Sequence, residues 1–323
     1  MTETTLVGGS NGGQPSAISP ESLPLLSKET LRSNGTAAFV PEKLKTIDVD
    51  AAETTPFQAK GAVEHLIKQL PDGEALKRVV ERDQVVDYTS YPFSCVGKLF
   101  VGANSNFAAP LWTGSAALVG RNLMLTASHC APWATSGSGA MAGWWMRFVP
   151  SYNYGTEPYG SSYVSDFRGV RNTDNVTGLD YVICRLYNPL GDRCGWLGSR
   201  WWSNSNPYTS PAAGTSWTSV GYPGDAMGGQ VMMVERAIRI HQVDNEGPKG
   251  RELEAHTFST PGWSGGPMFG TIDQQQRCIG VMSGKEFEND GFLGIFGQAH
   301  WHSVSAGGEM MTELILYGLA NWA

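Results

Sequence analysis

Short hydrophobic runs interrupted by polar residues recur along most of the 323-residue chain. Alternation of apolar and polar positions over about four to eight residues is typical of a strand with one buried face. The clearest runs are KLFVG, AALVG, WWMRFV, YVICRL, SWTSVGY, QVMMVE and RCIGVMSG. Forty glycines supply turns between such runs. The pattern therefore predicts an all-β chain.

One segment near the C-terminus differs because its apolar residues recur at roughly helical spacing. These residues are Met311, Leu314, Leu316, Leu319 and Trp322. Side chains three or four positions apart lie on one face of a helix. We therefore expect a helix over about residues 308–321.

The first 78 residues have a different composition. Their start, MTETTLVGGSNGGQPSAISPES, is rich in Ser, Thr, Gly and Pro, which predicts disorder there. A short helix is expected at AKGAVEHLIKQL. For the whole chain, 41% hydrophobic and 16% charged residues are typical of a protein with a sizeable core. The predicted strands lie in residues 79–323, which we interpret as the main domain.

Three segments supply residues for nucleophilic catalysis: TASHC at 126–130, GLDYVICRL at 178–186 and TPGWSGGPMF at 260–269. A serine hydroxyl is a poor nucleophile until a neighbouring base accepts its proton. An imidazole suits that task, and a carboxylate holds it in one tautomer. We therefore predict His129 as the base, Asp180 as the orienting carboxylate and Ser264 as the nucleophile.

Two other aspartates compete with Asp180 for this role. Asp174 lies in the polar loop RNTDNVTG and Asp192 in a turn, and both settings suit solvated side chains. Asp180 directly precedes the apolar run YVICRL, so it can be buried at the start of a strand. A buried carboxylate needs a partner, and His129 would supply it.

The glycines around Ser264 predict an oxyanion hole. Backbone N–H groups must point at the carbonyl oxygen that becomes negative during attack. Gly262 permits the tight bend that brings two such groups together. We expect these donors to be the N–H groups of Gly262 and Ser264. By itself, GWSGGP also fits a simple turn.

These motifs resemble those of the trypsin/chymotrypsin-like serine peptidases, and YPFSCVGKLF, PLGDRCGWLG and VGYPGD narrow the resemblance to the glutamyl endopeptidase (V8-like) branch. The resemblance spans roughly Val79 to the C-terminus. It implies two six-stranded antiparallel β-barrels, at about residues 91–190 and 205–305, followed by a C-terminal helix. His129 and Asp180 would come from the first barrel and Ser264 from the second.

The implied function is that of a serine endopeptidase that works through an acyl-enzyme. The alternative is a catalytically silent homologue that binds a partner through the same cleft. Silent homologues usually lose one of the three catalytic residues, whereas this chain has all three. An α/β-hydrolase esterase is excluded because its triad runs in the order Ser, Asp, His.

The resemblance also implies that residues 1–78 are a propeptide, cut after Arg78. In the chymotrypsin-like branch an aspartate before the nucleophile pairs with the freed N-terminal amine. Here that residue is Trp263, so activation would have to work differently. Secretion is expected as in similar enzymes, although residues 1–30 lack the pattern of a signal peptide.

The sequence leaves the substrate preference open. Glutamyl endopeptidases carry a histidine where this chain has Met282, which puts an acidic preference in doubt. The aspartate of trypsin-like enzymes is replaced by Phe258, which argues against cleavage after Arg or Lys. Lys285 would add a positive charge nearby, although an exposed lysine is the favoured interpretation. The expected pocket wall contains Ser259, Thr260, Met282, Ser283 and Gly284.

The five cysteines are an odd number, so at least one is not paired within the chain. Cys130 occupies a position that is often a half-cystine in similar enzymes, and Gly114 stands where its usual partner would be. Cys95 is the candidate replacement partner, and buried free thiols are an equal alternative.

No cofactor or metal is expected. The remaining histidines have no metal-ligand spacing with carboxylates or cysteines. His300 and His302 are two residues apart and would share one face of a strand there, where a surface or pocket-lining position is favoured over a metal site. The net charge of −7 argues against binding of nucleic acid. The sequence contains no apolar run of about 20 residues, so no transmembrane helix is expected. We expect a monomer whose partners are polypeptide substrates.

Overall fold

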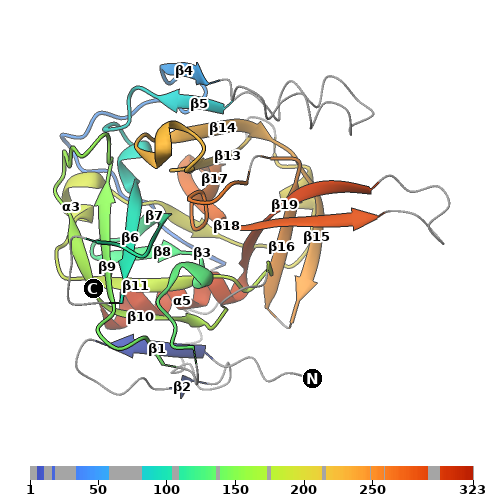
Figure 1. Ribbon diagram of the computed structural model, residues 1–323. Helices are drawn as coiled ribbons and strands as arrows, with labels where there is room; N and C mark the ends of the chain where they lie inside the picture. The colour runs from blue at the N-terminus through green and yellow to red at the C-terminus, as the bar shows by residue number, and fades with distance from the viewer. Residues whose placement is uncertain are drawn as a thin grey trace.

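Two β-sheets form most of the protein (Figure 1). The computed structural model describes residues 6–10, 17–18, 34–57, 82–103, 109–135, 139–172, 176–212, 216–247, 249–257, 259–289 and 299–322. The all-β prediction is confirmed, as is the helix near the C-terminus.

The first sheet contains a closed six-stranded antiparallel barrel. Its strand order is β11-β8-β7-β6-β9-β10, and a further pairing of β10 with β11 closes it. The six strands are β6 (Val96–Gly102), β7 (Trp112–Gly120), β8 (Leu123–Thr126), β9 (Trp145–Pro150), β10 (Ser162–Val170) and β11 (Val182–Leu186). Two short strands, β1 (Leu6–Ser10) and β2 (Ala17–Ile18), extend the sheet beyond β10.

The second sheet is larger than the predicted six strands. Its main path runs in the order β15-β16-β19-β18-β17-β13-β14-β5-β4; off this path, β12 pairs with β18, and β3 pairs with β12. The strands of the C-terminal half are β13 (Trp217–Gly221), β14 (Met233–Ile238), β15 (Ile240–Glu246), β16 (Gly250–Ala255), β17 (Pro267–Ile272), β18 (Gln275–Asn289) and β19 (Ala299–Gly308). The added strands are β3 (Gly35–Thr36), β4 (Thr54–Phe57), β5 (Arg82–Val85) and β12 (Gly198–Arg200).

The helices in the described part of the chain are few and mostly short. The longest described helix, α5 (Glu309–Asn321), agrees with the predicted range and packs against β11 and β19, as Figure 1 shows in red. The others are η2 (Phe93–Cys95), η3 (Ser128–Cys130), α3 (Gly191–Cys194), α4 (Asn206–Thr209) and η4 (Met227–Gly229). Among the described residues, no helix has the length and apolar character that crossing a membrane requires.

One large apolar core joins the two sheets and α5. It includes Leu99 and Ile183 from the first barrel, Phe269 from the second sheet, and Leu314 and Ile315 from α5. Each of these side chains is fully buried. Burial of apolar surface is the main stabilising contribution to folding, so this shared core fixes one sheet against the other.

Part of the predicted propeptide is built into the second sheet. β3 pairs with β12, and β4 pairs with β5. Between them, the backbone of Ile47 and Lys45 exchanges hydrogen bonds with Tyr91, at 3.0 and 2.8 Å. Phe39 stacks on Trp196 with ring centroids 4.4 Å apart. Arg78, Val79 and the helix expected at AKGAVEHLIKQL lie outside the described residues.

Candidate active site

His129 and Asp180 lie at neighbouring strand ends of the first barrel. β8 and β11 are antiparallel partners, with Thr126 opposite Val182, so the end of β8 and the start of β11 share one edge. His129 follows β8 in η3, and Asp180 precedes β11. The Nδ1 of His129 lies 2.6 Å from Oδ2 of Asp180. The backbone N–H of His129 also donates to Oδ1 of Asp180, at 2.9 Å. One carboxylate thus fixes both the backbone and the ring of the histidine.

The Asp180 carboxylate is completely buried and has a third donor. The hydroxyl of Ser283 donates to its Oδ2 at 2.6 Å. Burying a charge is costly unless hydrogen bonds replace its hydration, and three donors meet that need here. Burial disfavours the His129 imidazolium, but the Cys130 sulfur and the Asp180 carboxylate outweigh this effect and raise the pKa of His129.

Ser264 is half-buried and lies in a tight turn just before β17, formed by residues 261–265 and called the serine turn below. Gly262 has φ +98°, and a Cβ there would lie 2.5 Å from the carbonyl oxygen of Tyr222. Gly265 has φ +80°, and its Cβ would lie 2.1 Å from Oγ1 of Thr126. Both the left-handed conformation and the close contacts therefore require glycine on either side of the serine.

Ser115, a residue that sequence reasoning missed, ties the serine turn to the first barrel. The N–H of Ser115 donates to the Ser264 carbonyl at 2.8 Å, and its hydroxyl donates to the Gly262 carbonyl at 2.7 Å. The same hydroxyl accepts the N–H of Tyr222 at 2.8 Å. The only sequence signal was a serine inside the apolar strand TGSAALVG. These bonds dock the turn of the second sheet on β7 of the first.

The turn also lies against the residue that follows the predicted base. The Sγ of Cys130 is 3.7 Å from the Ser264 carbonyl oxygen. The structure therefore brings the segments of His129, Asp180 and Ser264 together where the two sheets meet.

The backbone N–H groups of the turn divide into two sets. Trp263 donates to the Thr260 carbonyl, and Gly265 donates to the Met282 carbonyl, at 2.9 and 2.8 Å. Within the described part of the chain, the N–H groups of Gly262 and Ser264 have no protein acceptor. These two N–H groups are the ones predicted for the oxyanion hole.

A buried arginine stands beside the residue that precedes Ser264. The Arg82 guanidinium lies over the Trp263 ring, 5.9 Å from its centroid. It donates two hydrogen bonds to Asp225, at 2.9 and 2.8 Å. Burial disfavours the Asp225 carboxylate, but Arg82 and Thr260 outweigh this and lower the pKa of Asp225. The arginine thus connects β5 to the serine turn, a pairing that no local pattern in the sequence predicts.

The predicted pocket residues have mixed surroundings. They are Ser259, Thr260, Met282, Ser283 and Gly284. The Met282 side chain is buried in an apolar cluster with Trp263. The hydroxyl of Ser283 is occupied by Asp180, and that of Thr260 donates to Asp225. Lys285 is exposed, and Phe258 lies outside the described residues. Position 282, where glutamyl endopeptidases carry a histidine, thus holds a buried apolar side chain in this protein.

A cavity of about 350 Å³ lies beside His129 on the first barrel. Trp112, Trp133 and Met141 supply apolar walls, and Arg171 supplies a positive charge. The Arg171 guanidinium is held by a hydrogen bond from Nη2 to the Ala134 carbonyl, at 2.7 Å. This cavity can receive a side chain next to the predicted base.

The expected Cys95–Cys130 pairing is wrong, and the alternative of buried free thiols holds for all five cysteines. Cys95 ends η2, which packs against α3, and its Sγ is 3.5 Å from the Cys194 carbonyl oxygen. Cys130 instead lies against the serine turn. Burial raises the pKa of the Cys95 thiol, so little reactive thiolate forms.

Replacing Gly114 by cysteine is expected to create a disulfide with Cys130. A Cβ at Gly114 would lie 3.0 Å from the Cys130 sulfur, the spacing that an S–S bond of about 2.0 Å produces. Closing a loop of this size stabilises a protein by about 3 kcal/mol in the chain-entropy account. Thiol titration and the Tm under oxidising conditions would measure both effects. Gly114→Ala is the control for the added Cβ. An oxidised cysteine variant no more stable than this control would contradict the prediction.

The fold and the site together indicate the class of enzyme that this protein resembles. A closed antiparallel barrel, a second sheet and a C-terminal helix, with a His–Asp pair beside a glycine-flanked serine, are the features of chymotrypsin-like serine peptidases.

Comparison with known proteins agrees with this class. No protein-family profile matches the chain. A glutamyl endopeptidase of Bacillus licheniformis is 25% identical over 245 residues, which are 75% of this chain and 67% of that protein. A solved structure of a Glu endopeptidase has a TM-score of 0.51 and 21% identity, and the match covers 74% of this chain and 97% of that one.

These findings confirm the resemblance found in the sequence. The chain is a homologue of glutamyl endopeptidase with the chymotrypsin-like fold. Its predicted enzyme class, a hydrolase of the serine endopeptidase type, is confirmed by the same relationship.

Proposed function

We propose that this protein cleaves polypeptides as a serine endopeptidase, with Ser264 as nucleophile, His129 as general base and Asp180 as orienting carboxylate. The observation that carries the proposal is the contact between His129 and the buried Asp180, at 2.6 Å, beside the docked serine turn. Because Nδ1 faces Asp180, Nε2 of His129 is the nitrogen that takes part in proton transfer.

The proposed reaction has two halves. The Ser264 oxygen forms a bond to the scissile carbonyl carbon as its proton passes to Nε2 of His129. The N–H groups of Gly262 and Ser264 stabilise the negative carbonyl oxygen. The C–N bond then breaks, and His129 returns the proton to the leaving amine. A water molecule, deprotonated by His129, releases the acyl group and regenerates the Ser264 hydroxyl.

An acidic residue before the cleaved bond is the second part of the proposal. It is supported by the similarity to a glutamyl endopeptidase and by Phe258 at the position of the trypsin-like aspartate. Met282 replaces the histidine of that branch, so the positive charge would have to come from another residue. Arg171 supplies a positive charge in a different cavity, beside His129, and not at the predicted pocket wall.

The last part of the proposal is that the protein is secreted and that its N-terminal propeptide is cut off after Arg78. Cleavage after Arg78 would leave β3 and β4 as a separate fragment, still paired with β12 and β5. The buried Val49 and Ala52 add apolar contacts to this fragment. We therefore expect a cut propeptide to stay bound, so activity should be measured on the full-length protein.

A fluorophosphonate probe and a peptide library test the proposal on the full-length protein. The probe should label Ser264, as located by mass spectrometry of the digested adduct, because only an activated serine reacts. The library should show cuts after Asp or Glu, and intact masses of the active species should show whether the chain ends at Arg78. A folded protein that neither reacts nor cuts would indicate the silent homologue instead. Cuts after other residues would reject only the acidic preference.

A further inference from the structure

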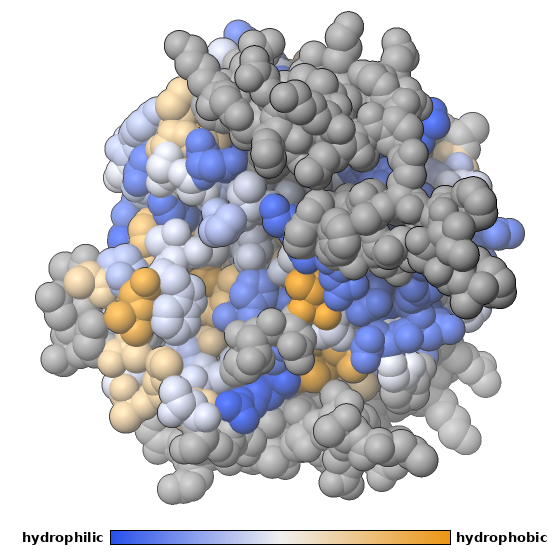
Figure 2. Space-filling view, turned by 45° about the vertical axis from the view of Figure 1, so that its right-hand side comes forward, coloured by the Kyte–Doolittle hydropathy of each residue, from blue (hydrophilic) through white to orange (hydrophobic). Residues whose placement is uncertain are grey.

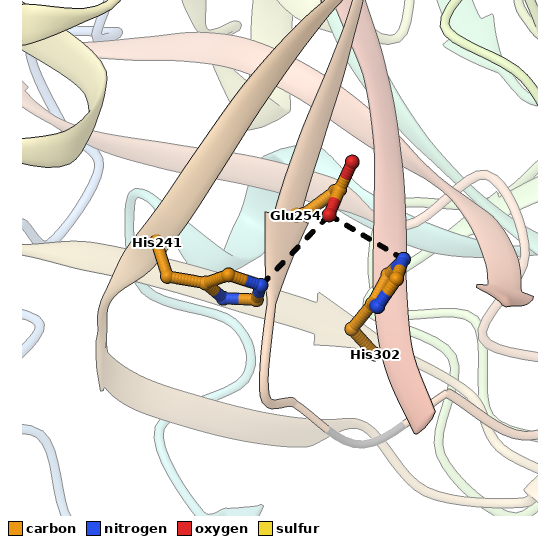
Figure 3. Close-up of side chains that lie close together, drawn as sticks. All are labelled: His241, Glu254 and His302. Carbon is orange, nitrogen blue, oxygen red and sulfur yellow. Dashed lines mark ion pairs between the residues drawn. The ribbon is translucent and has the colours of Figure 1, made fainter. Parts of the chain in front are cut away.

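Two histidines and a glutamate converge on the far edge of the second sheet (Figure 3). His241 belongs to β15, Glu254 to β16 and His302 to β19, three strands that lie side by side. The register shifts between Ile240 and Gln242, so His241 sits in a β-bulge opposite β16. Bulges re-aim a side chain, and this one accounts for His241 pointing towards Glu254 in Figure 3.

The spacing of the three groups fits one shared ion. Nε2 of His302 lies 3.4 Å from Oε2 of Glu254, and Nε2 of His241 lies 3.8 Å from the same oxygen. Charge-assisted N–H···O bonds are shorter, at about 2.7–2.9 Å. Ligands at about 2.0–2.2 Å from a tetrahedral zinc ion stand about 3.3–3.5 Å apart. The observed separations are close to that value.

The surroundings would hold the ligands in place. The side chains of His302 and Glu254 are 0% and 3% exposed, whereas His241 is 33% exposed and opens the site to solvent. His256 stacks on His241, with ring centroids 4.5 Å apart and planes 13° from parallel, which restrains the exposed ligand. The Asp244 and Glu252 carboxylates lie within 4.8 Å of that of Glu254. Figure 2, which brings this side of the molecule forward, shows many hydrophilic residues on it.

We propose that His241, Glu254 and His302 bind one Zn²⁺ ion, with the fourth position open to water. Two imidazoles and a carboxylate are a ligand set that zinc accepts, whereas Ca²⁺ and Mg²⁺ select oxygen ligands. The ion would join the edge strand β15 to β16 and β19. The sequence did not predict this metal site because the ligands come from separate segments, without a short motif. Of the histidine pair it considered, only His302 takes part; the side chain of His300 lies outside the described residues.

Calorimetric titration of the chelator-treated full-length protein with ZnCl₂ tests the site. The wild type should bind one Zn²⁺ per chain, and Mg²⁺ or Ca²⁺ should not compete. His241→Ala and the isosteric Glu254→Gln should each lose about 100-fold or more in affinity, since even residues behind a ligand contribute about 10–100-fold. His241 is partly exposed, so its replacement should leave the fold intact, as circular dichroism would show.

His129→Ala is the matched control, because zinc ions also bind catalytic histidines. It should bind Zn²⁺ as the wild type does. Loss of binding in His129→Ala, with His241→Ala unaffected, would place the ion at the triad and overturn the proposal. Absence of stoichiometric binding by the wild type would overturn it as well. Neither result depends on peptidase activity, so the proposed function and the zinc site are tested separately.

Discussion

Replacing Ser264 by alanine is expected to lower kcat by about 10⁶-fold, the scale of loss when one member of a catalytic triad is removed. The alanine variant has no oxygen to form the acyl-enzyme. The N–H groups of Gly262 and Ser264 and the binding cleft would remain, so a residual acceleration of about 10³–10⁴-fold over water should persist. Steady-state kinetics on a peptide cut by the wild type would give the ratio.

The variant should keep its fold and its affinity for the peptide. The contacts of residue 264 with Ser115 and Cys130 involve its backbone carbonyl, which alanine retains. The Tm should therefore change little, and the peptide should still bind in calorimetry. Ser210→Ala, which alters an exposed serine, is the matched control and should have wild-type kinetics. Equal kcat values in the two variants would remove Ser264 from the mechanism.

The sequence was sufficient to predict the features that depend on local patterns. The alternation in KLFVG and YVICRL marks β6 and β11 because a strand with one buried face needs period two. The glycines at 262 and 265 were informative because their positive φ values exclude other residues without strain. The C-terminal helix followed from helical spacing alone.

Features that depend on distant contacts were not predictable. Ser115 acts on the serine turn only because the two sheets dock, and its neighbours in sequence are ordinary core residues. The pairing of Arg82 with Asp225 requires β5 to lie beside β14, which no local pattern indicates. The His241–Glu254–His302 group depends on a β-bulge and on the order of three strands. Residues 34–57 belong to the N-terminal part in which no strand was predicted, yet they contain β3 and β4.

Replacing Asp180 by asparagine is expected to lower kcat by about 10⁴-fold with little change in geometry. The asparagine amide can donate to Nδ1 of His129, which then places the imidazole proton on Nε2. In that tautomer Nε2 cannot accept the proton of Ser264. Asp192→Asn is the matched control, since Asp192 is exposed and pairs with Arg121 on the surface. It should leave kcat unchanged, and a large loss in that variant would reopen the choice of carboxylate.

The pH dependence of the Asp180→Asn variant tests the same contact independently. Burial disfavours the His129 imidazolium, but Cys130 and Asp180 together raise its pKa above the ordinary 6.5. Because His129 must be neutral to act as base, the acid limb of kcat/KM should lie above pH 6.5 in the wild type and lower in the variant. The raised pKa also means that the ion pair contributes stability fully below about pH 6.5, and that this stability is lost as the pH rises through the folded-state pKa. The Tm difference between wild type and variant should therefore be largest below about pH 6.5 and should narrow at alkaline pH. An acid limb that does not move would show that Asp180 does not set the charge of His129.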